Sequence, residues 1–171
     1  MFVVHYLTDT IRIPPKLFGK PLKKSAQKIL AERYSGMMDS KLGFIVSVFD
    51  IEIDGKGLIS RTGETVHKIK FYALAFIPKI HEIISGEIVQ VADFGAFVRI
   101  GPTDAVLHLS QISSSPSRVD FKSGMIFNPH FKNPLRIGSK IKSRITAATF
   151  GKGISMKVGL TCNEETLGPL E

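Results

Sequence analysis

The chain contains a single cysteine, Cys162, and no tryptophan among its 171 residues. One cysteine cannot form a disulfide framework, which excludes the small secreted proteins held together by such bonds. Long apolar runs are also lacking. The longest, Phe71 to Ile77, stops at Pro78 and is far shorter than the roughly 20 residues that a membrane-spanning helix needs. The segment from Met1 to Thr10 has neither the basic start nor the long apolar centre of a secretory signal. We therefore expect a soluble, cytoplasmic protein.

The sequence also lacks the short motifs that mark common active sites. It has no glycine-rich phosphate loop ending in Gly-Lys-Ser or Gly-Lys-Thr, no Gly-x-Ser-x-Gly elbow and no paired cysteines. An isolated histidine is more often a surface or hydrogen-bonded residue than a metal ligand. The histidines here are widely spaced: His5, His67, His81, His108 and His130. We expect no autonomous active site, no bound metal and no cofactor.

Acidic residues are outnumbered, 15 against 23 basic ones, which gives a formal charge of +8. Such a charge suits a polyanionic partner, and equally an acidic protein surface. The imbalance is strongest between Asp120 and Glu164, a stretch without a single acidic residue. Its basic residues are Lys122, Lys132, Arg136, Lys140, Lys142, Arg144, Lys152 and Lys157. The stretch either faces phosphates or is a solvated basic surface with no ligand.

The first half of the chain is predicted to place a helix on an antiparallel sheet. Phe2 to Leu7 is predicted as a short strand, and Ile13-Pro14-Pro15 interrupts it because proline lacks an amide donor and restricts the residue before it. Pro21 suits the first turn of a following helix. Spacings of three and four residues place one set of side chains on a single helix face: Leu22, Ala26, Ile29, Leu30 and Arg33.

Long strands complete this half. Leu42 to Ile53 is rich in Ile, Val and Phe in an alternation that suits a sheet. Asp54 to Gly57 is predicted to form a turn, after which Leu58 and Ile59 begin a return strand. Val66 to Phe76 is predicted as another strand before Pro78.

The second half changes character near Ile80, so we place the domains at residues 1–79 and 80–171. Short strand-like runs separated by Gly, Ser, Pro and Asn are typical of a small barrel. The predicted strands are Glu82–Val91, Ala96–Ile100, Ala105–Leu109, Lys140–Thr149 and Ile154–Thr161. Ser113 to Leu135 is predicted as a long irregular loop. The fold class is therefore α+β.

The most informative segments combine two aromatic side chains and a histidine. They read Val91-Ala92-Asp93-Phe94-Gly95-Ala96-Phe97-Val98 and Val106-Leu107-His108-Leu109-Ser110. An antiparallel sheet can bring Phe94, Phe97 and His108 onto one surface. Nucleic-acid bases stack on exposed rings, at about 1 to 3 kcal/mol per base. The alternative is that both phenylalanines lie in the core, as most apolar residues do.

These segments closely resemble the RNA-binding OB module named after the largest protein of the small bacterial ribosomal subunit, and the likeness spans residues 82–161. The resemblance implies a five-stranded barrel whose nucleic-acid face carries Phe94, Phe97 and His108. It also implies a basic residue on the last strand, here Lys157. Nearby basic side chains are expected to hold phosphates: Arg99, Lys140, Lys142 and Arg144.

The whole chain resembles the larger stalk subunit, called E-prime, of archaeal DNA-directed RNA polymerases. The strings that carry this likeness are Ile11-Arg12-Ile13-Pro14-Pro15, Leu17-Phe18-Gly19, Lys41-Leu42-Gly43-Phe44, the turn at Gly57, and Val158-Gly159-Leu160-Thr161. The first half is similar to that family's truncated ribonucleoprotein-like domain. The resemblance implies a non-catalytic component that docks on the polymerase core and meets emerging single-stranded RNA. It also implies a heterodimer with the small stalk subunit, which is called F.

Four residues of the first half are candidates for docking on the polymerase: Pro14, Pro15, Gly43 and Gly57. The alternative function is a free-standing OB-fold RNA-binding factor associated with translation or the exosome. The N-terminal half separates the two, because a general RNA-binding factor does not need it in this form.

Overall fold

The computed structural model describes residues 1–120, 123–150 and 156–170. The chain divides into two compact units, Met1–Ile77 and Pro78–Glu171. In the described part, no helix is long and apolar enough to cross a membrane.

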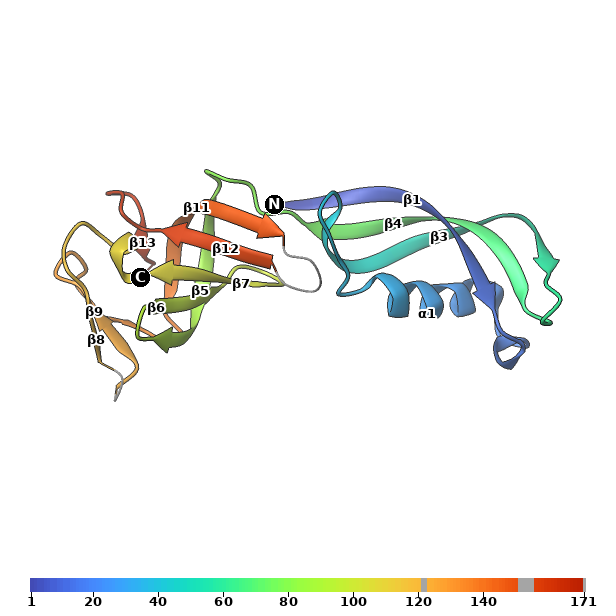
Figure 1. Ribbon diagram of the computed structural model, residues 1–171, viewed down its shortest axis with the longest axis horizontal. Helices are drawn as coiled ribbons and strands as arrows, with labels where there is room; N and C mark the ends of the chain where they lie inside the picture. Colours follow the sequence, from blue (N-terminus) through green and yellow to red (C-terminus); the bar gives the residue numbers. More distant parts are fainter. Residues whose placement is uncertain (121–122, 151–155, 171) are drawn as a thin grey trace. The chain divides into compact units, whose positions relative to one another are not determined.

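The first unit is a four-stranded antiparallel sheet with one helix on one of its faces (Figure 1). Its elements are β1 (Phe2–Ile13), η1 (Pro15–Leu17), α1 (Leu22–Tyr34), β2 (Met38–Asp39), β3 (Gly43–Ile59) and β4 (Thr65–Phe76). The strand order is β1-β4-β3-β2, so β4 lies between the two other long strands.

Helix α1 packs on the sheet through the face predicted from its spacing. Ala26 and Leu30 are fully buried in a core with Ile45, Ile69 and Phe71 of the sheet. Burying side chains of Leu or Phe size stabilises a fold by about 1.5 to 3 kcal/mol each.

Two details of the helix prediction were wrong. Pro21 caps the helix and does not lie in its first turn, and Leu22 is 38% exposed.

Arg33 reaches back toward the sheet, where its guanidinium lies 2.6 Å from an Asp9 carboxylate oxygen. Tyr34 donates a hydrogen bond to the same oxygen at 3.0 Å. Burial and the neighbouring Asp9 raise the pKa of Tyr34.

The turn predicted at Asp54 to Gly57 was also wrong. Strand β3 runs on to Ile59, with a shift in its pairing to β4 between Asp54 and Leu58. The turn lies at Ser60–Glu64, where Ser60 N–H donates to the Glu64 carbonyl at 2.8 Å. Gly55 has a φ of 75°, which glycine adopts without strain. Gly55 and Gly57 therefore lie in a shift of strand register within β3, since glycine suits a β-bulge as well as a turn.

The second unit is a closed five-stranded barrel, which confirms the predicted OB fold. Its strands are β5 (Ile83–Ala92), β6 (Gly95–Arg99), β7 (Asp104–His108), β11 (Lys140–Phe150) and β12 (Met156–Thr161). They follow the order β12-β7-β6-β5-β11, and β11 pairs with β12 to close the barrel. The short β13 (Gly168–Pro169) adds to β11. The interior is filled by Ile88, Val98, Leu107, Ile141, Ile145 and Leu160.

The segment from Ser113 to Leu135 is more regular than predicted. After η2 (Leu109–Gln111) it forms a small antiparallel sheet of β8 (Arg118–Asp120), β9 (Met125–Phe127) and β10 (Leu135–Arg136). Buried Asn128 ties it together, donating to Ser113 Oγ at 2.9 Å and to Ser117 Oγ at 2.8 Å. These strands have two or three residues each, too few for a hydrophobic alternation to be visible in the sequence.

Candidate nucleic-acid interface

Two phenylalanines and a histidine share one outer surface of the barrel, called the aromatic face (Phe94, Phe97 and His108). Strand pairing sets Gly95 opposite His108, and Phe97 opposite Val106. Phe94 is 40% exposed and Phe97 half-buried, while their neighbours Ala96 and Val98 point into the barrel. The two rings lie edge to face, with centroids 5.7 Å apart. They therefore offer an aromatic surface to solvent.

Gly95 allows β6 and β7 to approach closely beneath this face. A Cβ atom at Gly95 would overlap the Leu107 carbonyl oxygen, which is fixed backbone of the neighbouring strand. Its φ of 153° is also one that other residues rarely adopt. Leu109 N–H donates to the Phe94 carbonyl at 2.9 Å, which holds the strand end bearing Phe94 against β7.

Local hydrogen bonds orient the His108 ring. Its Nδ1 accepts from the Ser110 backbone N–H at 3.3 Å and lies 2.9 Å from Ser110 Oγ. With Nδ1 as the acceptor, the neutral ring carries its proton on Nε2. The histidine thus presents a hydrogen-bond donor beside two aromatic rings, a combination suited to a stacked base.

The predicted cations Arg99 and Lys157 lie on β6 and β12, the strands on either side of β7. Arg99 is at the far end of β6, where its Nε lies 3.0 Å from Asp104 Oδ1. This hydrogen bond and the charge of Asp104 raise the pKa of Arg99. Lys157 is exposed on β12, which runs parallel to β7 with Gly159 opposite Val106. Of the two, only Lys157 lacks an acidic partner among the described residues.

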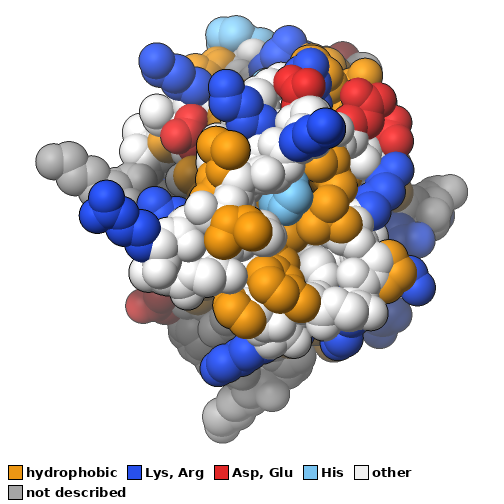
Figure 2. Space-filling model, turned by 90° about the vertical axis from the view of Figure 1, so that its right-hand side faces the viewer, with side chains coloured by type: hydrophobic (Ala, Val, Ile, Leu, Met, Phe, Trp, Pro, Cys, Tyr) orange, Lys and Arg blue, Asp and Glu red, His pale blue; other side chains and the backbone are white. Residues whose placement is uncertain are grey.

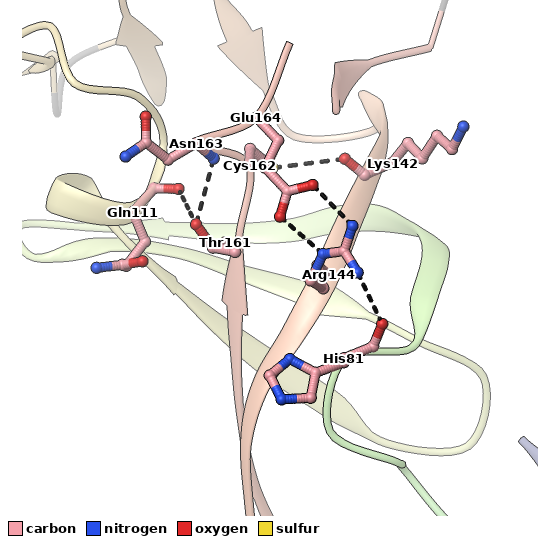
Figure 3. Close-up of polar contacts among 8 residues, drawn as sticks. All are labelled: His81, Gln111, Lys142, Arg144, Thr161, Cys162, Asn163 and Glu164. Carbon is pink, nitrogen blue, oxygen red and sulfur yellow. Dashed lines mark hydrogen bonds and ion pairs between the residues drawn. The ribbon is translucent and has the colours of Figure 1, made fainter. Parts of the chain in front are cut away.

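The remaining predicted cations lie on β11, separated from β6 by β5. Lys140 is opposite Glu87, and Lys142 is half-buried. Arg144 is held by Glu164 through two contacts of 2.7 Å, and it also donates to the His81 carbonyl at 3.1 Å (Figure 3). That ion pair lowers the pKa of Glu164. The structure therefore groups the three aromatic-face residues and places the three β11 cations elsewhere.

Of the docking candidates, Pro14, Pro15 and Gly57 lie toward one end of the first unit, where β1 ends and the β3–β4 turn is found. A Cβ at Gly63 of that turn would lie 3.9 Å from the Pro15 ring. Gly57 leaves room for His67, whose ring would overlap a Cβ there. Gly43 is at the opposite end of the sheet, and a Cβ on it would be 2.6 Å from the Phe76 carbonyl oxygen.

Exposed apolar side chains surround the Pro14–Pro15 end and form a surface called the apolar end. It consists of Phe18, Leu22, Leu58 and Ile59, of which Leu58 is 74% and Ile59 80% exposed. Figure 2 shows apolar side chains gathered on this end, bordered by basic ones. Beside it lies a cavity of about 280 Å³ lined by Ile13, Leu17 and His67.

A second exposed apolar surface, called the open sheet face, lies on the side of the sheet away from α1. Val4 and Tyr6 of β1 are about half exposed, and Tyr6 is opposite Tyr72, which is opposite Phe49. The ring centroids of Tyr6 and Tyr72 lie 5.0 Å apart, and those of Phe49 and Tyr72 lie 5.9 Å apart. Contiguous exposed aromatic surface is typical of protein interaction sites, so the open sheet face is a candidate docking surface.

The sequence analysis missed two carboxylates that form ion pairs with side chains predicted to bind phosphates. Asp104 is opposite Arg99 across a short hairpin, so alternation along β6 and β7 could have indicated this pair. Glu164 meets Arg144 only through the fold of the C-terminal segment, for which the sequence has no local signal. Among the described residues, no three His, Cys, Asp or Glu side chains gather as a metal-binding set.

Comparison with known proteins matches both halves of the chain. Residues 8–63 match the family described as the SHS2 domain found in the N terminus of Rpb7p/Rpc25p/MJ0397, and residues 77–157 match the S1 RNA binding domain. The DNA-directed RNA polymerase subunit Rpo7 of Saccharolobus shibatae is 32% identical over 163 residues, 94% of this chain and 91% of that protein.

The chain belongs to the Rpo7 family of archaeal RNA polymerase subunits. Rpo7 of Sulfolobus acidocaldarius is 30% identical over all of this chain and 94% of its own length. DNA-directed RNA polymerase II subunit RPB7 of Saccharomyces cerevisiae is 28% identical over 85% of this chain and 84% of that protein. The family predicted from the sequence and its arrangement of two different domains are thereby confirmed.

Proposed function

We propose that this chain is the larger stalk subunit of an archaeal RNA polymerase. It docks on the core enzyme together with the small stalk subunit and binds emerging single-stranded RNA. The observation that carries RNA binding is the aromatic face, where Phe94 and Phe97 lie on the outside of a barrel whose interior is already filled. Catalysis belongs to other subunits of the complex.

The two apolar surfaces of the first unit support the docking part of the proposal. The apolar end brings together Phe18 after η1, Leu22 at the start of α1, and Leu58 and Ile59 at the end of β3, and we assign it to the core enzyme. The open sheet face is flat and aromatic, and we assign it to the small stalk subunit. Each surface would be costly to leave in water, at about 25 cal/mol per Å² of apolar area. The isolated chain is accordingly expected to aggregate, and co-expression with the small stalk subunit to keep it in solution.

Docking is tested by placing a charge on each surface. Tyr6→Asp on the open sheet face is expected to abolish co-purification with the small stalk subunit. Ile59→Asp on the apolar end leaves that heterodimer intact and prevents its assembly with core polymerase. Phe127→Asp is the matched control, since Phe127 is also exposed but lies on β9. A Tyr6→Asp chain that still binds the small stalk subunit would show that this partner sits elsewhere.

RNA binding is tested by truncating the aromatic face in the heterodimer with the small stalk subunit. Phe94→Ala removes one stacking ring, which is worth about 1 to 3 kcal/mol, or about a 5- to 150-fold loss of affinity for a single strand. His108→Ala is expected to weaken binding as well. Fluorescence anisotropy with labelled RNA measures both, and Phe127→Ala is the control. Unchanged affinity in a folded Phe94→Ala chain would place the RNA site elsewhere.

The alternative of a free-standing RNA-binding factor shares the aromatic face but does not need the first unit. The match of residues 8–63 to a domain of polymerase subunits, and similarity to Rpo7 over the whole chain, favour the stalk subunit.

A further inference from the structure

The second unit contains a cleft outside the aromatic face, formed by the segment between η2 and β11 together with the C-terminal residues. It has a volume of about 660 Å³ and is called the basic cleft (Phe131, Lys132, Arg136, Lys140, Glu165 and Leu170). Two backbone hydrogen bonds hold its walls. Leu170 N–H donates to the Lys140 carbonyl at 2.8 Å, and Ser139 N–H donates to the Arg136 carbonyl at 2.9 Å.

The ring of Phe131 forms the floor of the cleft and packs against Gly168. A Cβ on Gly168 would lie 2.8 Å from the Phe131 ring, so the absence of a side chain lets that ring pack onto β13. Gly168 is in turn paired with Lys142 of β11. The floor is therefore attached to the barrel, and Phe131 remains half-buried at the cleft surface.

The charges around the cleft are mostly positive and unpaired. Lys132, Arg136 and Lys140 are exposed, and none forms an ion pair with a described residue. Among the described residues that line the cleft, Glu165 carries the one carboxylate. This differs from Arg99 and Arg144, which are both held by carboxylates. An anion entering the cleft would meet three cations that need not first break an ion pair.

The cleft borders the strand next to the aromatic face. The turn that carries Arg136 and Lys140 is bonded to β5, because Gly138 N–H donates to the Ile88 carbonyl at 2.8 Å and Ile88 N–H donates to the Ser139 carbonyl at 2.9 Å. On its other side β5 pairs with β6, where Gln90 is opposite Phe97. Neighbouring strands lie about 4.8 Å apart, so roughly 10 Å of sheet separates the turn from β6.

We infer that the basic cleft binds the phosphodiester backbone of the same single-stranded RNA whose bases stack on the aromatic face. The strand crosses β5 beside Gln90, and Arg136 and Lys140 hold its phosphates. Continuity with the aromatic face favours RNA over an acidic protein segment, which shares the negative charge but has no reason to lie next to exposed rings. This inference rests on the proposed RNA binding of the aromatic face.

The test compares RNAs of about four and about sixteen nucleotides, the span of site sizes for one OB fold. The full chain, in its heterodimer with the small stalk subunit, carries Arg136→Gln and Lys140→Gln together, and dissociation constants are measured across a salt series. Each phosphate contact to a single strand contributes about 0.7 to the slope of log affinity against log salt. The double variant is expected to lower that slope by about 1.4 for the longer RNA and to leave the shorter RNA unaffected.

The matched control is Lys23→Gln with Lys24→Gln, two exposed cations of α1 whose loss changes the net charge equally. Phe94→Ala is expected to weaken binding of both RNAs. If the Arg136 and Lys140 double variant still binds the shorter RNA with parental affinity, the two sites are distinct. If the double variant keeps the parental salt slope for the longer RNA, the inference is overturned while the aromatic face stays in place. Binding of a polyglutamate peptide that depends on Arg136 and Lys140, with the RNA slope unchanged, overturns it in favour of an acidic protein segment.

Discussion

Gly95→Ala is expected to destabilise the barrel more than any loss of exposed side chains on it. The new Cβ would overlap the Leu107 carbonyl oxygen, and β7 would have to move away from β6. Overpacking of this kind costs about 1 to 3 kcal/mol. A non-glycine residue held in the sparsely populated conformation of Gly95, with its φ of 153°, adds about 1 to 3 kcal/mol. The two effects sum to about 2 to 6 kcal/mol, a large part of the roughly 5 to 15 kcal/mol that stabilises a typical domain.

The control for this prediction is Gly138→Ala. Gly138 also lies in the second unit with a φ of 87°, but no heavy atom is within 4 Å of the position that its Cβ would take. It therefore reports the backbone cost alone, about 1 to 2 kcal/mol. Urea unfolding followed by circular dichroism, with the chain kept in solution as its heterodimer with the small stalk subunit, compares the two variants, and the greater loss for Gly95→Ala reports chiefly the steric effect. Equal destabilisation by the two substitutions would refute the close approach of β6 and β7, and with it the geometry that brings Phe94 to His108.

Three further predictions concern charge and burial. Asp104→Asn should release Arg99 from its ion pair and so tighten RNA binding, and the slope of log affinity against log salt should become steeper by about 0.7. The control is Asp9→Asn, which frees Arg33 in the first unit and should leave RNA affinity unchanged. Glu164→Gln should make the free energy of unfolding fall less steeply at acid pH. Because Arg144 lowers the folded pKa of Glu164, the stabilisation from this ion pair is present above the ordinary pKa of 4.5 and is lost as pH falls through the lower folded value. Urea unfolding between about pH 7 and about pH 3 measures this, and parallel pH profiles for parent and variant would contradict it. Cys162 should resist thiol reagents at about pH 8 until the chain is unfolded, because burial raises the pKa of its thiol to about 12; rapid labelling of the folded chain would disprove its burial.

Secondary structure could be predicted well where periodicity is long. The helix face through Ala26 and Leu30 and the barrel strands followed from spacing and from alternation of apolar residues. The predicted turn at Asp54–Gly57 failed because Gly55 and Gly57 serve a strand irregularity, and a glycine pair in sequence does not distinguish that from a turn. The sheet of β8, β9 and β10 was missed because its strands have only two or three residues each, and the hydrogen bonds of Asn128 to Ser113 and Ser117 beside it join residues distant in sequence.

The candidate site was only partly predictable for a related reason. Phe94, Phe97 and His108 lie on adjacent strands joined by a short hairpin, so their grouping follows from local register. Whether a cation is available depends on its partners, which are set by the tertiary fold. Arg144 looked free in a stretch without acidic residues, yet Glu164 lies directly against it at the close of that stretch (Figure 3). The predictions that fall on Lys122, Lys152 and Ile154 lie outside the described residues.

The most direct test of the stalk assignment is affinity purification of the tagged chain from its native extract, at moderate salt and after nuclease treatment, with every co-purifying chain identified. The large polymerase subunits and one small partner should be recovered together, and Ile59→Asp should lose the large subunits while keeping the small one. Recovery of ribosomal or exosome proteins without polymerase would contradict the assignment and leave only the RNA-binding barrel.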